Sequence, residues 1–236
     1  MVITTKVSPD RERWYDSFHD APDIFHSFSL AEDPAGLIPQ RLMPFLPQPP
    51  ARLLEIGCGS GRLTRDLARQ GTLIAALDLS PGLLAHARRM DPGFSRWVAG
   101  RGEALPFPTG AFEGICANFV LAHLRPGVLR RVLAECDRVL AQENQGIWLV
   151  ENHGDSEFQR LRGASPESGY AEMGPLIDTF NFRIIDDFEI EIRFESMEHA
   201  SKVLGYLLGA AVGDRVLRER VDHLNHRVVI LHRAWG

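Results

Sequence analysis

Two hydrophobic periodicities alternate along the chain between residues 51 and 150. Short and almost uninterrupted apolar runs predict buried strands over 51–56, 72–77, 94–99, 112–119 and 146–150. Apolar residues at helical spacing predict helices over 61–70, 81–90 and 126–141. Strands that alternate with helices form right-handed βαβ units, so the pattern predicts an α/β fold with a parallel sheet covered on both faces.

The two ends of the chain carry a different pattern. Before the prolines at 47–50, helical spacing predicts a helix over 11–19 and a second over 34–46. After residue 150, the pattern predicts in turn a helical insertion, a strand, two helices and a final strand: 153–181, 182–194, 197–208, 212–224 and 227–231. We therefore expect an N-terminal helical cap over 1–50 and one domain over 51–236.

The composition narrows the class of protein. The 236 residues are 44% hydrophobic and 24% charged, values typical of a globular protein, and the net charge is −5. This acidic balance disfavours nucleic acid as the partner, and no apolar run approaches the roughly 20 residues that span a bilayer. Cys58, Cys116 and Cys136 lack metal-ligand spacing, so we expect buried thiols and no metal. We expect a cytoplasmic protein, monomeric or homodimeric, that acts on a small molecule and does not bind a membrane.

A glycine-rich turn follows the first predicted strand. Gly57, Gly59 and Gly61 lie between that strand and a helix, where glycines let the backbone approach a nucleotide and helix amides face it. A dinucleotide fingerprint requires its third glycine at position 62, where this chain has Arg62. The turn therefore favours a nucleotide-like ligand other than NAD, and a nicotinamide oxidoreductase is the less favoured alternative.

Asp78 ends the second predicted strand, seventeen residues after Gly61. An acidic side chain at this place in a βαβ unit can accept hydrogen bonds from both ribose hydroxyls of a nucleoside. Capping of the helix that begins at Pro81 is the alternative role of this carboxylate.

Four segments in order resemble the motifs of class I S-adenosylmethionine-dependent methyltransferases, in particular the broad small-molecule group with a type 11-like domain. These segments are Leu53-Leu-Glu-Ile-Gly-Cys-Gly-Ser-Gly-Arg-Leu-Thr64, Ala76-Leu-Asp-Leu-Ser80, Gly102-Glu-Ala-Leu-Pro-Phe107 with Ala111-Phe-Glu113, and Asn118-Phe-Val-Leu-Ala-His-Leu124. The resemblance covers about residues 51–151. It implies a Rossmann-like, mostly parallel seven-stranded sheet with helices on both faces, an antiparallel last strand and an N-terminal helical lid.

The resemblance also implies a set of residues that bind S-adenosylmethionine. The glycines pass under the methionine portion, Glu55 lies near its amino group, and Asp78 holds the ribose. Leu79 packs on the adenine, and Asn118 offers its backbone carbonyl to the amino group. The full implied set is Glu55, Gly57, Cys58, Gly59, Gly61, Asp78, Leu79, Glu103, Ala104, Asn118 and Phe119. Glu113 departs from the aspartate usual in the family, with little functional consequence expected.

Methyl transfer from a sulfonium depends mainly on alignment, and a base is needed only where the acceptor atom carries a proton. The side chains predicted as catalytic are His123, after the fourth strand, and Glu151 and His153, after the fifth. Tyr15, His19 and Asn152 are predicted to contact the acceptor. Apolar residues of the insertion fit either an acceptor pocket or ordinary core: Met173, Leu176, Ile177, Phe180 and Phe182.

Two further alternatives keep S-adenosylmethionine as the ligand but give the protein a different methyl acceptor or no catalytic activity. The acceptor could be RNA or protein, although the acidic balance and the lack of a basic module argue against RNA. The chain could instead be an inactive cofactor-binding partner subunit, although the intact Glu55, Asp78 and glycines argue against decay of the site.

Overall fold

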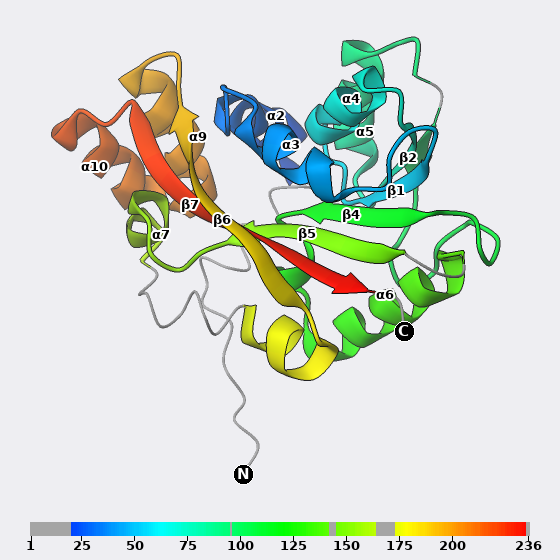
Figure 1. Ribbon diagram of the computed structural model, residues 1–236. Coiled ribbons are helices and arrows are strands. Elements are labelled where there is room, and N and C mark those ends of the chain that lie inside the picture. Colours follow the sequence, from blue (N-terminus) through cyan, green and yellow to red (C-terminus); the bar gives the residue numbers. More distant parts are fainter. Residues whose placement is uncertain (1–19, 95, 142–144, 164–172, 235–236) are drawn as a thin grey trace.

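The computed structural model describes residues 20–94, 96–141, 145–163 and 173–234. Its centre is a seven-stranded sheet in the order β3-β2-β1-β4-β5-β7-β6 (Figure 1). The strands are β1 (Arg52–Ile56), β2 (Leu73–Asp78), β3 (Trp97–Ala99), β4 (Gly114–Asn118), β5 (Gly146–Asn152), β6 (Arg183–Arg193) and β7 (His223–Ala234). The first five are mutually parallel, and β7 is antiparallel to both β5 and β6. The expected Rossmann-like sheet with an antiparallel last strand is confirmed.

Helices cover both faces of the sheet. They are α2 (Pro22–Ala31), α3 (Leu37–Leu42), η1 (Met43–Phe45), α4 (Arg62–Arg69), α5 (Pro81–Met90), η2 (Leu121–His123), α6 (Pro126–Val139), α7 (Glu157–Leu161), η3 (Pro175–Thr179), α9 (Met197–Leu208) and α10 (Ala210–Glu219). Successive side chains of β1 point to opposite faces. Leu54 therefore packs with α6, and Leu53 packs with α3 and α4. The pattern of buried strands predicted this two-sided covering.

A third apolar cluster lies beyond the ends of β6 and β7. There α9 packs against both α2 and α10, with Phe28 from α2, Phe158 from α7 and Phe194 after β6 among the buried side chains. Figure 1 shows α9 and α10 at the end of these two long strands, with α2 and α3 beside the middle of the sheet. The cluster joins the N-terminal and C-terminal parts of the chain over one end of the sheet.

Several element boundaries differ from the predicted ones. The predicted helix over 212–224 ends at Glu219, because Arg220 adopts a left-handed conformation (φ 56°) that stops the helix. The last strand consequently begins at His223 and is longer than predicted. The predicted helix over 34–46 begins at Leu37, since the Asp33 carboxylate accepts hydrogen bonds from the backbone N–H of Leu37 and Ile38, both at 2.8 Å.

Two other expectations concern the ends and the insertion. The predicted helix over 11–19 lies outside the described residues. Apolar residues of the insertion belong to the core beneath α6 rather than to a cavity wall: Met173, Leu176 and Phe182 are buried there, with Ile177 and Phe180 packed against them. Within the described ranges, no helix combines the length and the apolar character needed to cross a membrane.

Candidate active site

A cavity of about 280 Å³ opens at the carboxyl ends of the parallel strands. Its lining includes the turn after β1, the end of β2, the segments after β3 and β4, and the last residue of β5. Helices α2 and α7 also contribute residues to the lining. This is the edge at which open parallel sheets bind their ligands, because helix N-termini and loop amides converge there.

The three glycines of the turn have different surroundings. All three adopt positive φ, at 75°, 55° and 79° for Gly57, Gly59 and Gly61. A Cβ on Gly57 would collide with the Val120 side chain, and a Cβ on Gly61 would collide with the Trp97 indole. A Cβ on Gly59 would meet no atom within 4 Å. Two glycines are therefore required by packing, and Gly59 leaves open space at the cavity.

Asp78 fixes the middle of this turn. One oxygen of its carboxylate accepts a hydrogen bond from the Gly59 N–H and the other from the Ser80 N–H, both at 2.7 Å. The side chain is buried at the end of β2 and lines the cavity. Ser80 in turn caps α5 by accepting from the Leu83 N–H. Asp78 thus couples the glycine turn to the second strand, in addition to the ribose contact predicted for it.

Glu55 lies behind the turn with its side chain almost fully buried. The Thr64 hydroxyl donates a hydrogen bond to its carboxylate. Burial raises the pKa of Glu55 to about 7, with the Asp78 carboxylate adding to the rise and the Thr64 hydrogen bond opposing it. A carboxyl group with a pKa near 7 loses its proton readily when a cation binds next to it, because the cation stabilises the carboxylate anion.

Glu55→Gln is expected to remove part of the pH dependence of folding stability. A carboxyl pKa raised from 4.5 to about 7 favours the folded state at low pH, and this stabilisation is lost as the pH rises through 7. At pH 8 the glutamine variant should therefore be more stable than the wild type by about 3 kcal/mol, and at pH 5 by less than about 1 kcal/mol. Urea unfolding at both pH values measures the difference.

Glu113→Gln is the control for that measurement. The side-chain hydrogen bond from Arg52 lowers the pKa of Glu113, so its ionised form stabilises the fold and the variant should lose stability at pH 8. Equal stabilities of the wild type and Glu55→Gln at both pH values would contradict the assigned pKa of Glu55.

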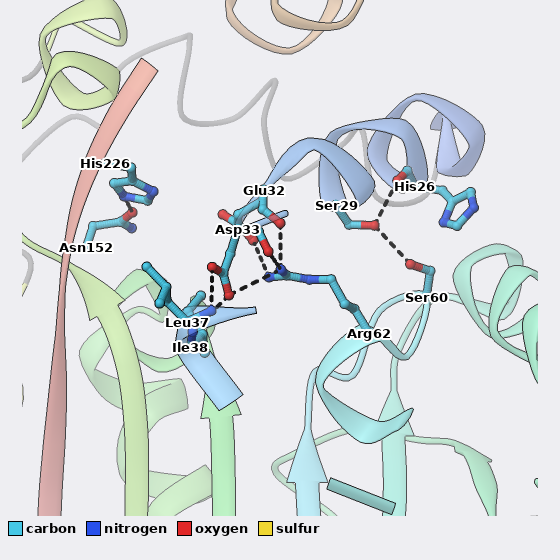
Figure 2. A network of polar contacts seen from close by, with 10 residues as sticks. All are labelled: His26, Ser29, Glu32, Asp33, Leu37, Ile38, Ser60, Arg62, Asn152 and His226. Carbon is cyan, nitrogen blue, oxygen red and sulfur yellow. Dashed lines mark hydrogen bonds and ion pairs between the residues drawn. The ribbon is translucent and has the colours of Figure 1, made fainter. Parts of the chain in front are cut away.

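The chain before β1 is tied to the glycine turn by a buried ion-pair network (Figure 2). Arg62, at the start of α4, approaches Glu32 Oε2 at 3.3 Å and Asp33 Oδ2 at 3.6 Å. The same guanidinium donates to the backbone carbonyl oxygens of both residues, at 2.5 and 3.2 Å. Ser29 and Ser60 add a hydroxyl–hydroxyl hydrogen bond of 2.9 Å between α2 and the turn. Burial raises the pKa of Glu32 to about 7, against the opposing effect of Arg62.

Aromatic rings form another part of the cavity lining. The Phe28 and Phe158 rings stack with centroids 5.6 Å apart, and both line the cavity. The imidazole of His226, from β7, lies 4.9 Å from the Phe158 centroid and 5.4 Å from that of Phe119. We call Phe28, Phe119 and Phe158 the aromatic wall, because all three line the cavity; His226 packs against two of them without joining the lining. Such a surface accommodates an apolar or aromatic part of a ligand.

The cavity gathers most of the residues predicted from the sequence. Those in its lining are Glu55, Gly57, Cys58, Gly59, Asp78, Leu79, Glu103, Asn118, Phe119, His123 and Asn152. Gly61 and Ala104 flank the lining without joining it. All three cysteines are buried free thiols, as expected, and burial raises the pKa of Cys58 well above its usual range.

The predicted catalytic and acceptor residues separate into three groups. His123 lines the cavity, and Asn152 lies between His123 and His226. Glu151 is fully buried and accepts a hydrogen bond from the Ala122 N–H at 3.0 Å, while His153 accepts one from the Asp155 N–H at 3.2 Å. Neither Glu151 nor His153 belongs to the lining. Tyr15 and His19 lie outside the described residues.

Three features of the site were missed by the reasoning from sequence. Helix α2 carries a proline at its start and Asp23 in its first turn, signals that could have identified it. The sequence argument uses Arg62 only to show that the third glycine of a dinucleotide site is missing. In the structure, the Arg62 guanidinium pairs with the buried carboxylates of Glu32 and Asp33. His226 carries no sequence signal that distinguishes it from a surface or sheet-edge histidine, yet it is fully buried, with its ring packed against Phe119 and Phe158.

The lining suits S-adenosylmethionine, whose sulfonium and ammonium groups are cationic. Four acidic residues belong to the lining: Glu32, Glu55, Asp78 and Glu103. The Asn118 side-chain oxygen is buried without a hydrogen-bond partner in the described structure. The open space at Gly59 lies beside the Asp78 carboxylate. These residues provide anionic partners, an available acceptor and room for the backbone to approach a ligand.

Comparisons with known proteins agree with this fit. The family model described as "Methyltransferase domain" matches residues 54–146. The malonyl-[acyl-carrier protein] O-methyltransferase of Halorhodospira halophila is 33% identical over 144 residues, which cover 59% of this chain and 47% of that protein. The demethylmenaquinone methyltransferase of Beutenbergia cavernae is 33% identical over 81 residues, covering 34% and 33%. Each alignment thus spans less than half of the curated relative.

Solved structures extend the likeness of the fold. A SAM-dependent methyltransferase from Methanosarcina mazei superposes with a TM-score of 0.54, over 83% of this chain and 98% of that one, at 17% identity. The family match covers the glycine turn, Asp78 and the segment after β4, which are the elements that form the cofactor side of the cavity. Residues 54–146 are therefore similar to a methyltransferase domain, and the fold of the chain is the one found in S-adenosylmethionine-dependent methyltransferases.

Proposed function

We propose that this protein transfers a methyl group from S-adenosylmethionine to a small-molecule acceptor. One observation carries the proposal: a single cavity joins the glycine turn and Asp78 on one side to the aromatic wall on the other. A cofactor and an acceptor bound in one enclosed space can be aligned for in-line displacement, which is the main requirement of this reaction. S-Adenosylmethionine supplies the methyl group from its sulfonium.

The residues of the chain take defined roles in this proposal. Asp78 accepts hydrogen bonds from the ribose hydroxyls, and Leu79, which is 45% exposed, packs on the adenine. Glu55 pairs with the amino group of the methionine portion, assisted by the backbone carbonyl of Asn118. Gly59 lets the backbone approach the ligand. The aromatic wall excludes water from the acceptor side and orients its apolar part.

The segment before β1 supports a cap over the cavity. We infer that residues 1–50 form this helical cap and that residues 51–236 form the catalytic domain, with an insertion around 153–181. Phe25, Phe28 and Ser29 of α2 contribute to the lining. The hydrogen bond from Ser29 to Ser60 and the Arg62 ion pairs hold this helix against the glycine turn. A lid in this position would shield the reacting atoms from solvent.

The acceptor class is inferred from the shape and chemistry of the wall. The names of the two curated relatives specify different acceptors, a malonyl group on acyl-carrier protein and demethylmenaquinone. They support methyl transfer without selecting one acceptor for this chain. Phe28, Phe119 and Phe158 favour a molecule with an apolar or aromatic portion.

Labelling with S-adenosylmethionine that carries a radioactive methyl group tests the proposal. The protein is incubated separately with a low-mass bacterial extract, with total RNA and with a protein fraction. We expect the label in the low-mass fraction. Label confined to RNA or protein would overturn the acceptor class. Failure of the protein to bind S-adenosylmethionine or S-adenosylhomocysteine in calorimetry would overturn the activity itself.

Asp78→Ala is expected to weaken S-adenosylmethionine binding by about 1–3 kcal/mol, roughly a 5- to 150-fold rise in Kd. The variant removes the ribose partner and leaves the N–H groups of Gly59 and Ser80 without their acceptor. Isothermal calorimetry measures the change. Asp155→Ala, which alters an exposed carboxylate outside the lining, is the matched control and should bind normally. An unchanged Kd for Asp78→Ala would contradict the ribose contact assigned to Asp78.

A further inference from the structure

Glu32 brings an acidic side chain to the cavity lining from the segment before β1. Its backbone N–H donates a hydrogen bond to the Phe28 carbonyl oxygen at 3.0 Å and completes the last turn of α2. Residues four apart lie on the same face of a helix, so Glu32 is adjacent to Phe28 of the aromatic wall. Arg62, the first residue after the glycine turn, approaches the same carboxylate at 3.3 Å (Figure 2). Glu32 therefore lies where the glycine turn and the aromatic wall meet.

Glu32 is fixed through its backbone and through one carboxylate oxygen. Its carbonyl oxygen accepts a hydrogen bond from Arg62 at 2.5 Å, and Oε2 accepts a second from the same guanidinium. The backbone also pairs with Ile192 of β6 in an antiparallel bridge. Among the described residues, Arg62 is the only hydrogen-bond partner of this carboxylate, so Oε1 keeps its lone pairs for a ligand in the cavity.

The other three acidic residues of the lining have different settings. Asp78 accepts hydrogen bonds from two backbone N–H groups, both at 2.7 Å. Glu55 lies behind the glycine turn and accepts from a threonine hydroxyl. Glu103 follows β3 and lies 3.8 Å from Arg101. Of the four, Glu32 is the one that precedes β1 and adjoins the aromatic wall in its own helical turn.

The charge state of Glu32 changes near neutral pH. Burial raises the pKa of Glu32 to about 7, the Arg62 charge opposes this rise, and the neighbouring Asp33 carboxylate adds to it. The residue of β6 that pairs with Glu32, Ile192, is apolar. Above pH 7 the carboxylate is ionised and can take up a proton, and below pH 7 it already carries one. A general base is most effective when its pKa lies near the working pH.

We infer that Glu32 is a catalytic residue, the general base that takes the proton of the acceptor, and that the acceptor carries a hydroxyl group on an apolar or aromatic body. The inference rests on the proposed function, because it names the reacting group of the same acceptor. The hydroxyl oxygen attacks the methyl carbon, so an O–C bond forms and the C–S bond breaks, with its electron pair going to sulfur. The hydroxyl proton passes to Oε1 of Glu32.

The charge of the lining favours this class of acceptor. A carboxylate or thiolate acceptor is an anion, and four acidic residues would repel it. Such acceptors, like uncharged amines, also have no proton to lose and would leave a base without a role. A hydroxyl group is neutral, can donate a hydrogen bond to Glu32, and needs a base to react.

The chemistry of the labelled product tests the acceptor class. The wild type labels the low-mass extract from radioactive S-adenosylmethionine, and the product is treated with mild alkali and then with hot hydriodic acid. Methyl ethers withstand the alkali and release methyl iodide in the acid. Methyl esters lose their label in the alkali, and methyl groups on nitrogen, sulfur or carbon stay bound under the same conditions. We expect an ether. An ester, or label that survives both treatments, would overturn the inference.

Glu32→Gln keeps the shape of the side chain but cannot take up a proton. The labelling rate of the wild type should rise as the pH increases through about 7, where Glu32 loses its proton. At pH 8 the variant should label on the order of 10²- to 10⁴-fold more slowly, without this rise. Its calorimetric Kd for S-adenosylhomocysteine should match that of the wild type. Asp33→Asn is the matched control, since it removes the other carboxylate paired with Arg62 but lies outside the lining, and it should keep the rise.

Two results with these variants would contradict the role of Glu32. Weaker binding of S-adenosylhomocysteine to Glu32→Gln would assign the carboxylate to the cofactor. A rise with pH that persists in Glu32→Gln and disappears in His123→Gln would place the base at His123. The product analysis on the wild type still tests the inference if Glu32→Gln does not fold.

Carbon NMR of protein labelled at the glutamate carboxyl carbon needs no acceptor. With S-adenosylhomocysteine bound, the Glu32 signal, which Glu32→Gln assigns, should titrate with a midpoint near pH 7. A Glu32 carboxyl that is still protonated at pH 8.5 in this complex would overturn the inference. Failure of the wild type to bind S-adenosylhomocysteine would instead overturn the proposed function.

Discussion

Replacing Arg62 with methionine is expected to lower the free energy of unfolding by about 3–5 kcal/mol at pH 8. The change leaves the Glu32 and Asp33 carboxylates buried without their shared cation. Removing one partner of a buried ion pair is costly because the remaining charge has neither water nor a counterion. The loss should be smaller at pH 5.5, where Glu32, with a pKa raised to about 7, takes up a proton.

Urea unfolding followed by circular dichroism measures this effect. Arg69→Met is the matched control, because Arg69 belongs to the same helix and pairs with Asp66 at the surface. Exposed pairs of this kind contribute about 0–1 kcal/mol, so the control should change little. The double variant Glu32→Gln with Arg62→Met should recover part of the lost stability. Similar losses for Arg62→Met and Arg69→Met would show that the buried network does not hold α2 to the turn.

Gly61→Ala is the second substitution with a large expected effect. The left-handed conformation at this position costs an alanine roughly 1–2 kcal/mol. The added methyl group would also collide with the Trp97 indole, and overpacking of this kind costs roughly 1–3 kcal/mol more. We expect a lower melting temperature and, since the turn must shift, weaker binding of S-adenosylmethionine.

Gly59→Ala separates these two consequences. Gly59 has a positive φ like Gly61, but a methyl group added there meets no atom within 4 Å and lies at the cavity. The variant should remain folded with a modest loss of stability and still bind S-adenosylmethionine poorly, because the methyl group occupies space the ligand needs. Thermal unfolding and calorimetry on both variants check this. Equal destabilisation by the two substitutions would contradict the packing assigned to Gly61.

The parallel part of the fold could be read from the sequence because its strands are buried on both faces. Such strands leave continuous apolar runs, and their order along the chain fixes the βαβ connections. The cofactor side of the cavity could be predicted equally well, because Gly57 to Gly61 and Asp78 are held together by local chain geometry. Asp78 is the last residue of β2, the strand beside β1, and the hydrogen bond that it accepts from Gly59 lies within one βαβ unit.

The acceptor side could not be read in the same way. His226 and Asn152 lie far apart in sequence and meet through the pairing of β5 with β7. No local pattern distinguishes a histidine that will be buried from one at a strand surface. The two partners of Arg62 precede it by 30 and 29 residues, in a segment that pairs with β6 at Glu32. These contacts arise from tertiary packing, which the periodicity of a single chain does not encode.

The position of β7 has a consequence for the order in which the protein assembles. β7 lies between β5 and β6, although β6 is synthesised before it. Until residues 223–234 have been made, β6 has no neighbouring strand, and β5 presents an unpaired edge. During translation this edge is open to other chains, and non-local pairing of this kind forms slowly. His226 arrives with the same strand, so the residues of the glycine turn and Asp78 are made well before the ring that packs against Phe119 and Phe158.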